Sequence, residues 1–503
     1  MSRFSFLIIL STFLSTFSQA DFKFRINEDL GTLDWGYGEV NYVVVQQLMD
    51  GLTGSGERGE ALPAIAQSWK TISGKNAAIE FKLREDARWS DGTPVCAQHF
   101  IDAWLRVLSP KFASPYAHYL FDIRNARAYH STKLSDSKQV GLIAQGCSKL
   151  RIELERPIGY FADLVSHWVF LPIRLDLVDK YGSKWTQPDH LVVTGPYKLA
   201  EWKRDQHYLL KRNPLYYGKA GFEETLKAIV VSADATALSL FQNKTLDWVH
   251  DVPFLEKPRL SAMPEYKIYE AYIGYHLGFK HDATGALTRD QRCALSYAID
   301  KNKIGQLLRG GETPAWSVSH PTMSALKPRP VFDAARARKL WAGRDGELDV
   351  HFYSKDIHTP LMEFVQQEWK KNLGITVKLQ RTDGKVYWSR LHKEPPPVFL
   401  SGTTAAYNHP YSFLSEFLSE SHANWGRYKS ASYDNVALKT TTLAAGPALT
   451  RAVKQTESQI LSHDCAVIPL YFRKTAALVS SKWTGFHVNP LSRIYLKNVR
   501  AKH

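Results

Sequence analysis

The chain has 503 residues, of which 44% are hydrophobic and 22% charged, so an intrinsically disordered protein is excluded. Lys and Arg number 64 against 49 Asp and Glu, but these cations are scattered and form no long basic run, so we expect no nucleic-acid partner. At about 100–200 residues per domain, this length predicts two to four folding units. Aromatic residues make up 12%, which indicates large cores or aromatic-lined ligand surfaces.

Residues 1–20 have the pattern of a cleaved secretory signal peptide. Arg3 precedes a short apolar run, and the small residues Ser18 and Ala20 follow it. The run is shorter than the roughly 20 residues that a membrane span needs, although an uncleaved anchor is the alternative. No Cys follows the small residues, so a lipid anchor has no attachment point, and the mature chain is expected to begin near Asp21 and to be exported.

Four cysteines are present, at Cys96, Cys147, Cys293 and Cys465. Their spacing matches neither a C-x-x-C pair nor a zinc finger. In an oxidising compartment they can form up to two disulfides in any of three pairings, and four separate buried thiols are the alternative.

The first half of the chain alternates strand and helix patterns. Residues 22–26 alternate apolar and polar side chains, which predicts a half-buried strand. Residues 41–52 carry apolar side chains at helical spacing. A strand is predicted over 77–86, a turn with Asp-Gly at its centre over 89–95, and a helix over 96–108.

The second half predicts two strand–helix–strand units. Two strands are expected around a turn near residues 204–205. A strand–helix–strand order then follows over 226–249 and again over 348–380, where Gly374 ends the helix. Because this order favours parallel pairing, the sequence predicts two α/β lobes.

Catalytic motifs are missing from the sequence. It contains no G-x-S-x-G, H-E-x-x-H or P-loop motif, and Ser135–Lys138 matches S-x-x-K only as a short chance pattern. The 18 histidines form no ligand-like cluster, because His351 falls in a predicted strand and His358 at a helix start. The sequence therefore favours a solute receptor over an enzyme, and we expect no cofactor and no metal.

The segment 79–120, which reads IEFKLREDARWSDGTPVCAQHFIDAWLRVLSPKFASPYAHYL, has a specific pattern. It resembles the dipeptide/oligopeptide-binding proteins of bacterial ABC importers. Similar matches follow in order over nearly the whole mature chain, at residues 32–36, 62–70, 184–202, 211–218, 293–304, 368–379 and 466–472.

The resemblance implies an α/β, bilobal periplasmic-binding-protein fold, with two lobes that close over the ligand by hinge bending. Lobe one would be discontinuous and comprise residues 21–52, 173–272 and 474–503, with an additional domain at 53–172 packed on it. Lobe two would comprise residues 273–473. The family also implies a monomeric periplasmic protein whose partner is an inner-membrane ABC permease with its ATPase subunits.

In the oligopeptide-binding branch the ligand lies extended and pairs with the protein backbone like an added strand. By resemblance the lining segment here comprises Gly402, Thr403, Thr404, Ala405, Ala406, Tyr407 and Asn408. The family places an aspartate that meets the ligand's α-ammonium at the position of Ala406. This chain therefore lacks the usual acid at a position that otherwise matches closely.

Three further positions match ligand-facing residues of the family, Asp29, Tyr116 and His358, and Arg309 lies close to where a basic partner would be expected. The three matched positions each have a structural alternative. Asp29 can be a helix cap or a surface acid, Tyr116 can be core packing, and His358 can simply begin a helix.

Two interpretations of the ligand remain open. The first is a peptide whose ammonium meets another acid, such as Asp29, or stays solvated. The second is a ligand without a free α-ammonium: an N-blocked peptide, a cell-wall fragment, a sugar or an opine. A different class of function also stays open, namely a periplasmic sensor or adaptor that is not coupled to transport.

Overall fold

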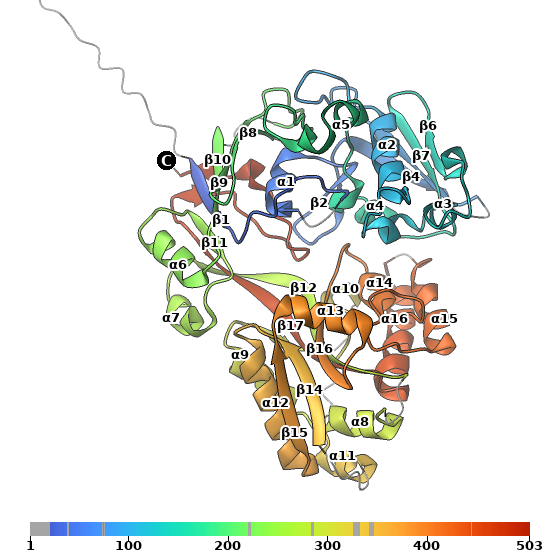
Figure 1. Cartoon of the computed structure of the whole chain (residues 1–503), viewed down its shortest axis with the longest axis vertical. Coiled ribbons are helices and arrows are strands. Elements are labelled where there is room, and N and C mark those ends of the chain that lie inside the picture. The colour runs from blue at the N-terminus through green and yellow to red at the C-terminus, as the bar shows by residue number, and fades with distance from the viewer. Residues whose placement is uncertain are drawn as a thin grey trace, which may run out of the picture.

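The computed structural model describes residues 21–37, 40–72, 74, 76–219, 223–282, 286–324, 332–341, 347–443 and 445–502 (Figure 1). The predicted signal peptide, residues 1–20, lies outside the described residues. Within them, no helix combines the length and the apolar character that crossing a membrane requires.

One eleven-stranded sheet runs through both halves of the molecule, in the order β15-β14-β16-β12-β17-β11-β1-β10-β9-β8, with β13 beside β17. Figure 1 shows β1 and β8–β10 in the upper half, β14–β16 in the lower half, and β12 and β17 between them. The strands are β1 (Phe22–Ile26), β8 (Tyr197–Lys203), β9 (His207–Arg212), β10 (Thr225–Val230), β11 (Trp248–His250), β12 (Tyr266–Phe279), β13 (Thr313–Pro314), β14 (Glu347–Tyr353), β15 (Thr376–Thr382), β16 (Val398–Thr404) and β17 (Val467–Val479).

The predicted strand–helix–strand units are confirmed. In the upper half, β10, α6 (Asp234–Gln242) and β11 follow one another, and β1 pairs in parallel with both strands. In the lower half, β14 and β15 pair directly in parallel on either side of α12 (His358–Leu373). Gly374 follows α12 with φ of 73°, a left-handed conformation that glycine adopts at no steric cost.

The long strands β12 and β17 connect the two halves. They pair from Tyr266 with Leu478 at one end to Gly278 with Val467 at the other. The register shifts between Glu270 and Gly274 and again between Tyr275 and His276. Such irregularities bend a strand pair locally, which makes this region the expected hinge between the halves.

The upper half also carries three small sheets, β2-β3, β4-β5-β7-β6 and β18-β19, and the N-terminal helices. The predicted turn before α2 is present, because the N–H of Trp89 donates to the carbonyl of Thr93 and Gly92 has φ of 92°. The elements are β2 (Thr53–Ser55), β3 (Ala61–Pro63), β4 (Ala66–Ile72), β5 (Ala78–Leu83), β6 (Leu142–Ala144), β7 (Lys149–Glu153), β18 (Trp483–Thr484), β19 (Arg500–Ala501), α1 (Tyr42–Leu48), α2 (Ala97–Leu108), α3 (Ala126–His130), α4 (Phe161–Leu164), α5 (Leu175–Tyr181) and α7 (Lys257–Leu260), with the short helices η1 (Ala117–Leu120), η2 (Ser137–Gln139), η3 (Trp168–Phe170), η4 (Gly182–Thr186), η5 (Phe254–Glu256) and η9 (Leu496–Asn498).

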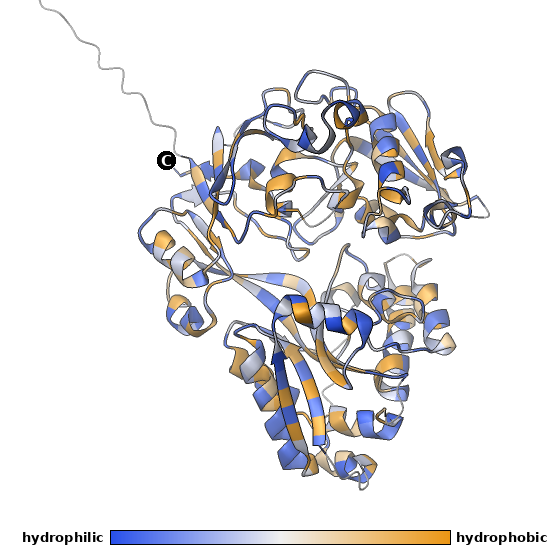
Figure 2. Cartoon of the chain, in the orientation of Figure 1, coloured by the Kyte–Doolittle hydropathy of each residue, from blue (hydrophilic) through white to orange (hydrophobic). Residues whose placement is uncertain are grey.

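The lower half packs its helices around β14–β16 and the near ends of β12 and β17 (Figure 1). These helices are α8 (Arg289–Tyr297), α9 (Ile304–Leu308), α10 (Pro321–Ser324), α11 (Ala334–Trp341), α13 (Gly384–Lys393), α14 (Tyr411–Leu414), α15 (Ala431–Thr440), α16 (Pro447–Ser458), η6 (Lys301–Lys303), η7 (Ser415–Phe417) and η8 (Gln459–His463). Separate hydrophobic clusters form in the two halves, one around Trp104 and Phe170 and another around Trp369 and Leu400. Figure 2 shows hydrophobic residues spread through both halves, in agreement with two cores. The predicted domain boundaries stay a prediction.

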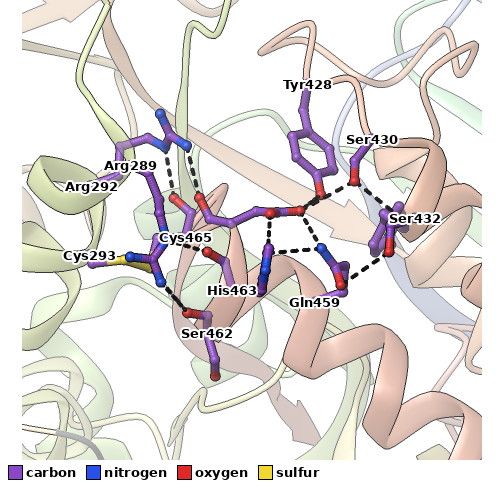
Figure 3. A network of polar contacts seen from close by, with 12 residues as sticks. Arg289, Arg292, Cys293, Tyr428, Ser430, Ser432, Gln459, Ser462, His463 and Cys465 are labelled. Carbon is purple, nitrogen blue, oxygen red and sulfur yellow. Dashed lines mark hydrogen bonds and ion pairs between the residues drawn. A yellow bond between two sulfur atoms is a disulfide. The ribbon is translucent and has the colours of Figure 1, made fainter.

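The four cysteines form two disulfides, Cys96–Cys147 and Cys293–Cys465, one of the three pairings left open above. The second joins α8 to the segment after η8, and Arg292 reinforces this joint by donating to the carbonyls of Asp464 and Cys465 (Figure 3). Cys293 and Cys465 are 172 positions apart, so this disulfide constrains a very long loop of the unfolded chain.

We expect the double substitution Cys293→Ser with Cys465→Ser to lower the free energy of unfolding by about 2–5 kcal/mol, because the unfolded chain regains its loop entropy. Urea unfolding monitored by tryptophan fluorescence measures this change. The same pair of substitutions at Cys96 and Cys147, which close a loop of 51 positions, is the comparison. An unchanged unfolding midpoint for the Cys293/Cys465 variant would contradict the expectation.

Candidate functional site

A pocket of about 290 Å³ lies where the two halves meet, and we call it the junction pocket. Its walls come from both halves. The upper half contributes Asn27, Asp234, Asp251, Val252, Phe254 and Lys257, and the lower half and the connecting strands contribute Tyr275, Glu312, Lys355, Asp356, Ile357, Tyr471, Arg473, Lys474 and Ala476. A ligand in this pocket would therefore contact both halves at once, as a hinge-bending receptor requires.

An ion pair between Asp251 and Arg473 lines the junction pocket. Burial by itself would raise the pKa of Asp251, but the Arg473 guanidinium, with His250 and Lys355, holds that pKa below its usual range. Asp251 in turn raises the pKa of Arg473. Tyr42 of α1 is close enough to this pair that burial and the Asp251 charge raise its pKa. Both members of the pair are therefore charged, and each neutralises the other.

A cluster of aromatic rings forms the wall of the pocket on the lower half. Tyr275 and Tyr471 stack with ring centroids 4.8 Å apart. His358 contacts the edges of the Tyr353 and Tyr275 rings, and its Nδ1 lies 3.1 Å from the carbonyl oxygen of Tyr353. Burial lowers the pKa of His358 to about 4, so this imidazole is neutral at physiological pH.

The strand β16 has an open edge beside the aromatic wall. It pairs with β12 along its whole length, from Val398 to Thr404, but with β14 only at Val398 and Phe399. The edge from Ser401 to Thr404 is therefore not covered by β14. Along such an edge, alternate N–H and C=O groups point away from the sheet and can pair with another extended chain.

Gly402 lets the Tyr275 ring pack against this strand. A Cβ at position 402 would lie 2.9 Å from the nearest carbon of that ring, which is closer than real contacts allow. The glycine thus keeps the surface flat where the open edge meets the aromatic wall.

The backbone of Ala406 is held from both sides of the cleft. Its N–H donates to the Ser412 hydroxyl at 2.8 Å, and its carbonyl accepts a hydrogen bond from the Arg493 guanidinium at 3.1 Å. Arg493 is 4% exposed and also donates to the carbonyl of Ser166 in the upper half. A buried cation therefore lies next to the position at which the sequence lacks an acid.

A second set of contacts joins the two halves at a distance from β12 and β17. Tyr407 stacks on Tyr160 with ring centroids 4.7 Å apart, and the N–H of Gly159 donates to the carbonyl of Thr441 at 3.0 Å. These contacts close the cleft on the side away from the connecting strands.

The family model for bacterial extracellular solute-binding proteins, family 5 (middle part), matches residues 60–425. The chain belongs to this family. The periplasmic oligopeptide-binding protein OppA of Salmonella typhimurium is 29% identical over 484 residues, covering 91% of this chain and 87% of the relative. The probable deoxycholate-binding periplasmic protein YgiS of Escherichia coli is 27% identical over 508 residues, covering 96% and 94%.

Solved structures of the family have the same fold. The murein tripeptide binding protein MppA of Escherichia coli gives a TM-score of 0.84 at 26% identity, covering 97% of this chain and 99% of that chain. The Borrelia burgdorferi oligopeptide-binding protein OppAIV gives 0.82 at 25% identity, covering 96% and 99%. The predicted bilobal α/β fold is thus confirmed for this solute-binding protein.

The segment Gly402–Asn408 of this solute-binding protein lies where the two halves approach each other. Thr403 is buried and donates to the Glu416 carboxylate at 2.6 Å, whereas Thr404 is exposed. Ala405 is buried, and its N–H donates to the carbonyl of Tyr272 at 2.9 Å. Asn408 is half-buried and lies beside Gly59 of the upper half. Their contact with a ligand stays a prediction.

Asp29 has its carboxylate occupied by neighbouring donors. Oδ1 accepts from the N–H of Gly31 and the hydroxyl of Tyr208, and Oδ2 accepts from the indole of Trp202 and the N–H of Asp205. Burial alone would raise the pKa of Asp29, but these hydrogen bonds lower it. In the described structure this carboxylate anchors the turn between β8 and β9.

Three further predicted residues are dispersed around the cleft. The Tyr116 ring contacts the Trp168 ring edge-to-face at 4.5 Å, consistent with a packing role. Arg309 is exposed at the end of α9 with φ of 51°. His358 is fully buried behind Tyr275 and Tyr353. A contact between any of these three residues and a ligand stays a prediction.

Sequence reasoning missed the charged residues of the cleft, namely Asp251, Arg473, Arg493 and Glu416. Asp251 and Arg473 are 222 positions apart, and Arg493 and Ala406 are 87 positions apart, so no local spacing signals either pair. The described residues contain no group of three His, Cys, Asp or Glu side chains that could hold a metal ion.

We expect Asp251→Asn to lower the free energy of unfolding by about 1–2 kcal/mol at pH 7, because Arg473 loses its counter-charge. The effect stays below that of a fully buried pair, since the two side chains are 33% and 22% exposed. Because the pKa of Asp251 is lowered in the folded state, its contribution to the free energy of unfolding is fully present above the unfolded-state pKa of about 3.9. This contribution is lost as the pH falls further, toward the folded-state pKa.

Urea unfolding of the wild type and of Asp251→Asn, at pH 7 and at pH 3, measures the change in free energy of unfolding and its loss at low pH. Asp290→Asn removes an exposed ion pair with Arg289 and is the matched control, with an expected change below about 0.5 kcal/mol. Equal losses for the two variants at pH 7 would contradict a special role for Asp251.

Proposed function

We propose that this chain captures an extended peptide in the cleft between its two lobes in the periplasm and delivers it to an inner-membrane ABC permease with its ATPase subunits. The open edge of β16 from Ser401 to Thr404, beside a pocket lined by both halves, carries the proposal. A peptide backbone can add to this edge as a further strand. Relatives named as oligopeptide-binding and murein peptide-binding proteins support it.

Main-chain pairing would give affinity that does not depend on the peptide's sequence. The small side chains at Gly402, Ala405 and Ala406 let a ligand backbone approach closely. The junction pocket of about 290 Å³, next to Tyr275, is large enough for a peptide side chain and a few waters. Because Asp251 and Arg473 neutralise each other there, this pocket would tolerate ligand side chains of different charge.

Ligand binding would be coupled to closure of the two halves about β12 and β17. The Tyr160–Tyr407 stack, the Arg493–Ala406 hydrogen bond and the Gly159–Thr441 hydrogen bond all cross the cleft. A ligand that contacts both halves favours the conformation in which these contacts form. The protein would act as a monomer, without a cofactor and without chemical turnover.

One observation favours a second candidate, a ligand without a free α-ammonium. Residue 406 is an alanine, and the cation nearest to it is the buried Arg493. An ammonium group at that position would be repelled rather than bound. A relative named as a probable deoxycholate-binding protein indicates that members of this family differ in ligand class.

A backbone-methylation scan tests the main-chain mode. We expect a free-amine tetrapeptide library to bind the mature protein by calorimetry. N-methylation of single amides of a bound peptide should abolish binding at alternate positions, because every second N–H points toward the edge of β16. Side-chain changes at the same positions should alter affinity far less.

Binding that survives methylation at every amide would rule out strand addition. An N-acetylated library that binds while the free-amine library does not would favour the second candidate. Absence of binding by either library would overturn the proposal of a peptide receptor.

A further inference from the structure

Glu416 is a half-buried acid in η7 next to the open edge of β16. Its Oε2 accepts a hydrogen bond of 2.6 Å from the hydroxyl of Thr403, which is itself 2% exposed. Among the described residues, no Lys, Arg or His nitrogen forms an ion pair with this carboxylate within 4.0 Å. It is therefore a carboxyl group in the cleft without a counter-ion.

The surroundings of Glu416 place it between the two halves. Tyr119 of η1, in the upper half, is near enough that Glu416 contributes to raising its pKa. Burial raises the pKa of Glu416 itself to about 8, and the Thr403 hydroxyl only partly opposes that effect. Arg493 influences Tyr119 from its place beside Ala406 but does not neutralise Glu416.

Two other acids near the cleft, Asp251 and Asp29, have partners. Asp251 is paired with Arg473, and the oxygens of Asp29 are filled by four donors. A buried carboxylate with no partner is costly, and the cost is removed when a cation reaches it. Glu416 is thus an acid beside β16 that a ligand cation can satisfy.

We propose that Glu416 receives the cationic amino group of the bound ligand and releases its own proton to solvent as it does so. The carboxylic acid and the ligand ammonium become a carboxylate–ammonium pair, and one proton leaves to the buffer. This inference rests on the proposed function, in which a peptide backbone extends along β16. It assigns recognition of the free amine to residue 416 instead of residue 406.

Tyr119, His276 and Arg493, which lie around this position, keep their charge between pH 5.5 and 7. Burial raises the pKa of Tyr119 to about 12 and lowers that of His276, which contacts Phe417, to about 4. Burial also lowers the pKa of His118 and, well below its ordinary value, that of His167. His118 and the exposed His422 near it are the groups to control for.

The test measures proton release on binding. Calorimetry of the free-amine tetrapeptide library at pH 6.5, in two buffers of different ionisation enthalpy, should show release of about one proton per peptide bound. Affinity should rise about tenfold per pH unit between pH 5.5 and 7. In this range the ligand's α-amino group, with a pKa of about 7.7–8.0, stays protonated.

Glu416→Gln keeps a hydrogen-bond acceptor for Thr403 but cannot ionise. We expect this variant to release no proton, to lose the pH dependence, and to bind the N-acetylated library as the wild type does. Glu420→Gln removes an exposed acid four residues further on and His422→Gln removes the exposed imidazole, and both should behave as the wild type.

A stability measurement checks the state of Glu416 without ligand. Because burial raises its folded-state pKa, the stability associated with protonated Glu416 is present below about pH 4.3 and is lost as the pH rises through about 8. Ligand-free Glu416→Gln should therefore melt at a higher temperature than the wild type at pH 9, with a smaller difference at pH 5. Equal melting temperatures at pH 9 would count against the proposal.

The inference is overturned if the wild type binds free-amine peptides without releasing a proton. It is also overturned if Glu416→Gln binds them with the same proton release and pH profile. In both cases the proposed function survives, since peptide binding itself is observed. Failure of every peptide to bind the wild type overturns both.

Discussion

The pairing of β12 with β17 is the interaction on which the rest of the structure depends. These strands carry the sheet from one half of the molecule to the other, so each half completes its core against the same two segments. The register shift between Glu270 and Gly274 interrupts the ladder within the shared region. The two halves are thus joined by backbone hydrogen bonds whose ladder is irregular between Glu270 and His276, where a bend is expected.

The same strands position the functional site. Tyr275 of β12 and Tyr471 and Arg473 of β17 line the junction pocket, and β12 also aligns the whole of β16. Because β14 diverges from β16 after Phe399, the edge beyond it is left open within reach of this pocket. Sheet geometry therefore creates both a backbone surface and a side-chain pocket.

The charged side chains in the cleft differ in whether they have a partner. Asp251 and Arg473 satisfy each other, Arg493 bonds to backbone carbonyls, and Glu416 has only a hydroxyl donor. In a poorly solvated space, an unpaired group of this kind determines which ligand charge is favoured. This is the physical reason that the ligand's end groups, more than its side chains, would decide affinity.

Local patterns predicted much of the fold correctly, because periodicity and turn chemistry act over a few residues. The strand Phe22–Ile26, the helix Ala97–Leu108 and the left-handed Gly374 are found where the sequence indicates them. The resemblance also identified the segment Gly402–Asn408, and the lack of an acid at Ala406 can be read from the sequence alone. The sequence does not determine the cysteine pairing, since four cysteines allow three combinations and their spacing does not choose among them.

By itself, the sequence determined the secondary-structure order, the family resemblance and the absence of an acid at position 406. Only the tertiary structure decided which charges meet, because Asp251 and Arg473, or Arg493 and Ala406, come together through folding over long separations. It also decided that Glu416 has no counter-ion among the described residues, since burial and ion pairing are properties of the packed chain and of no single segment.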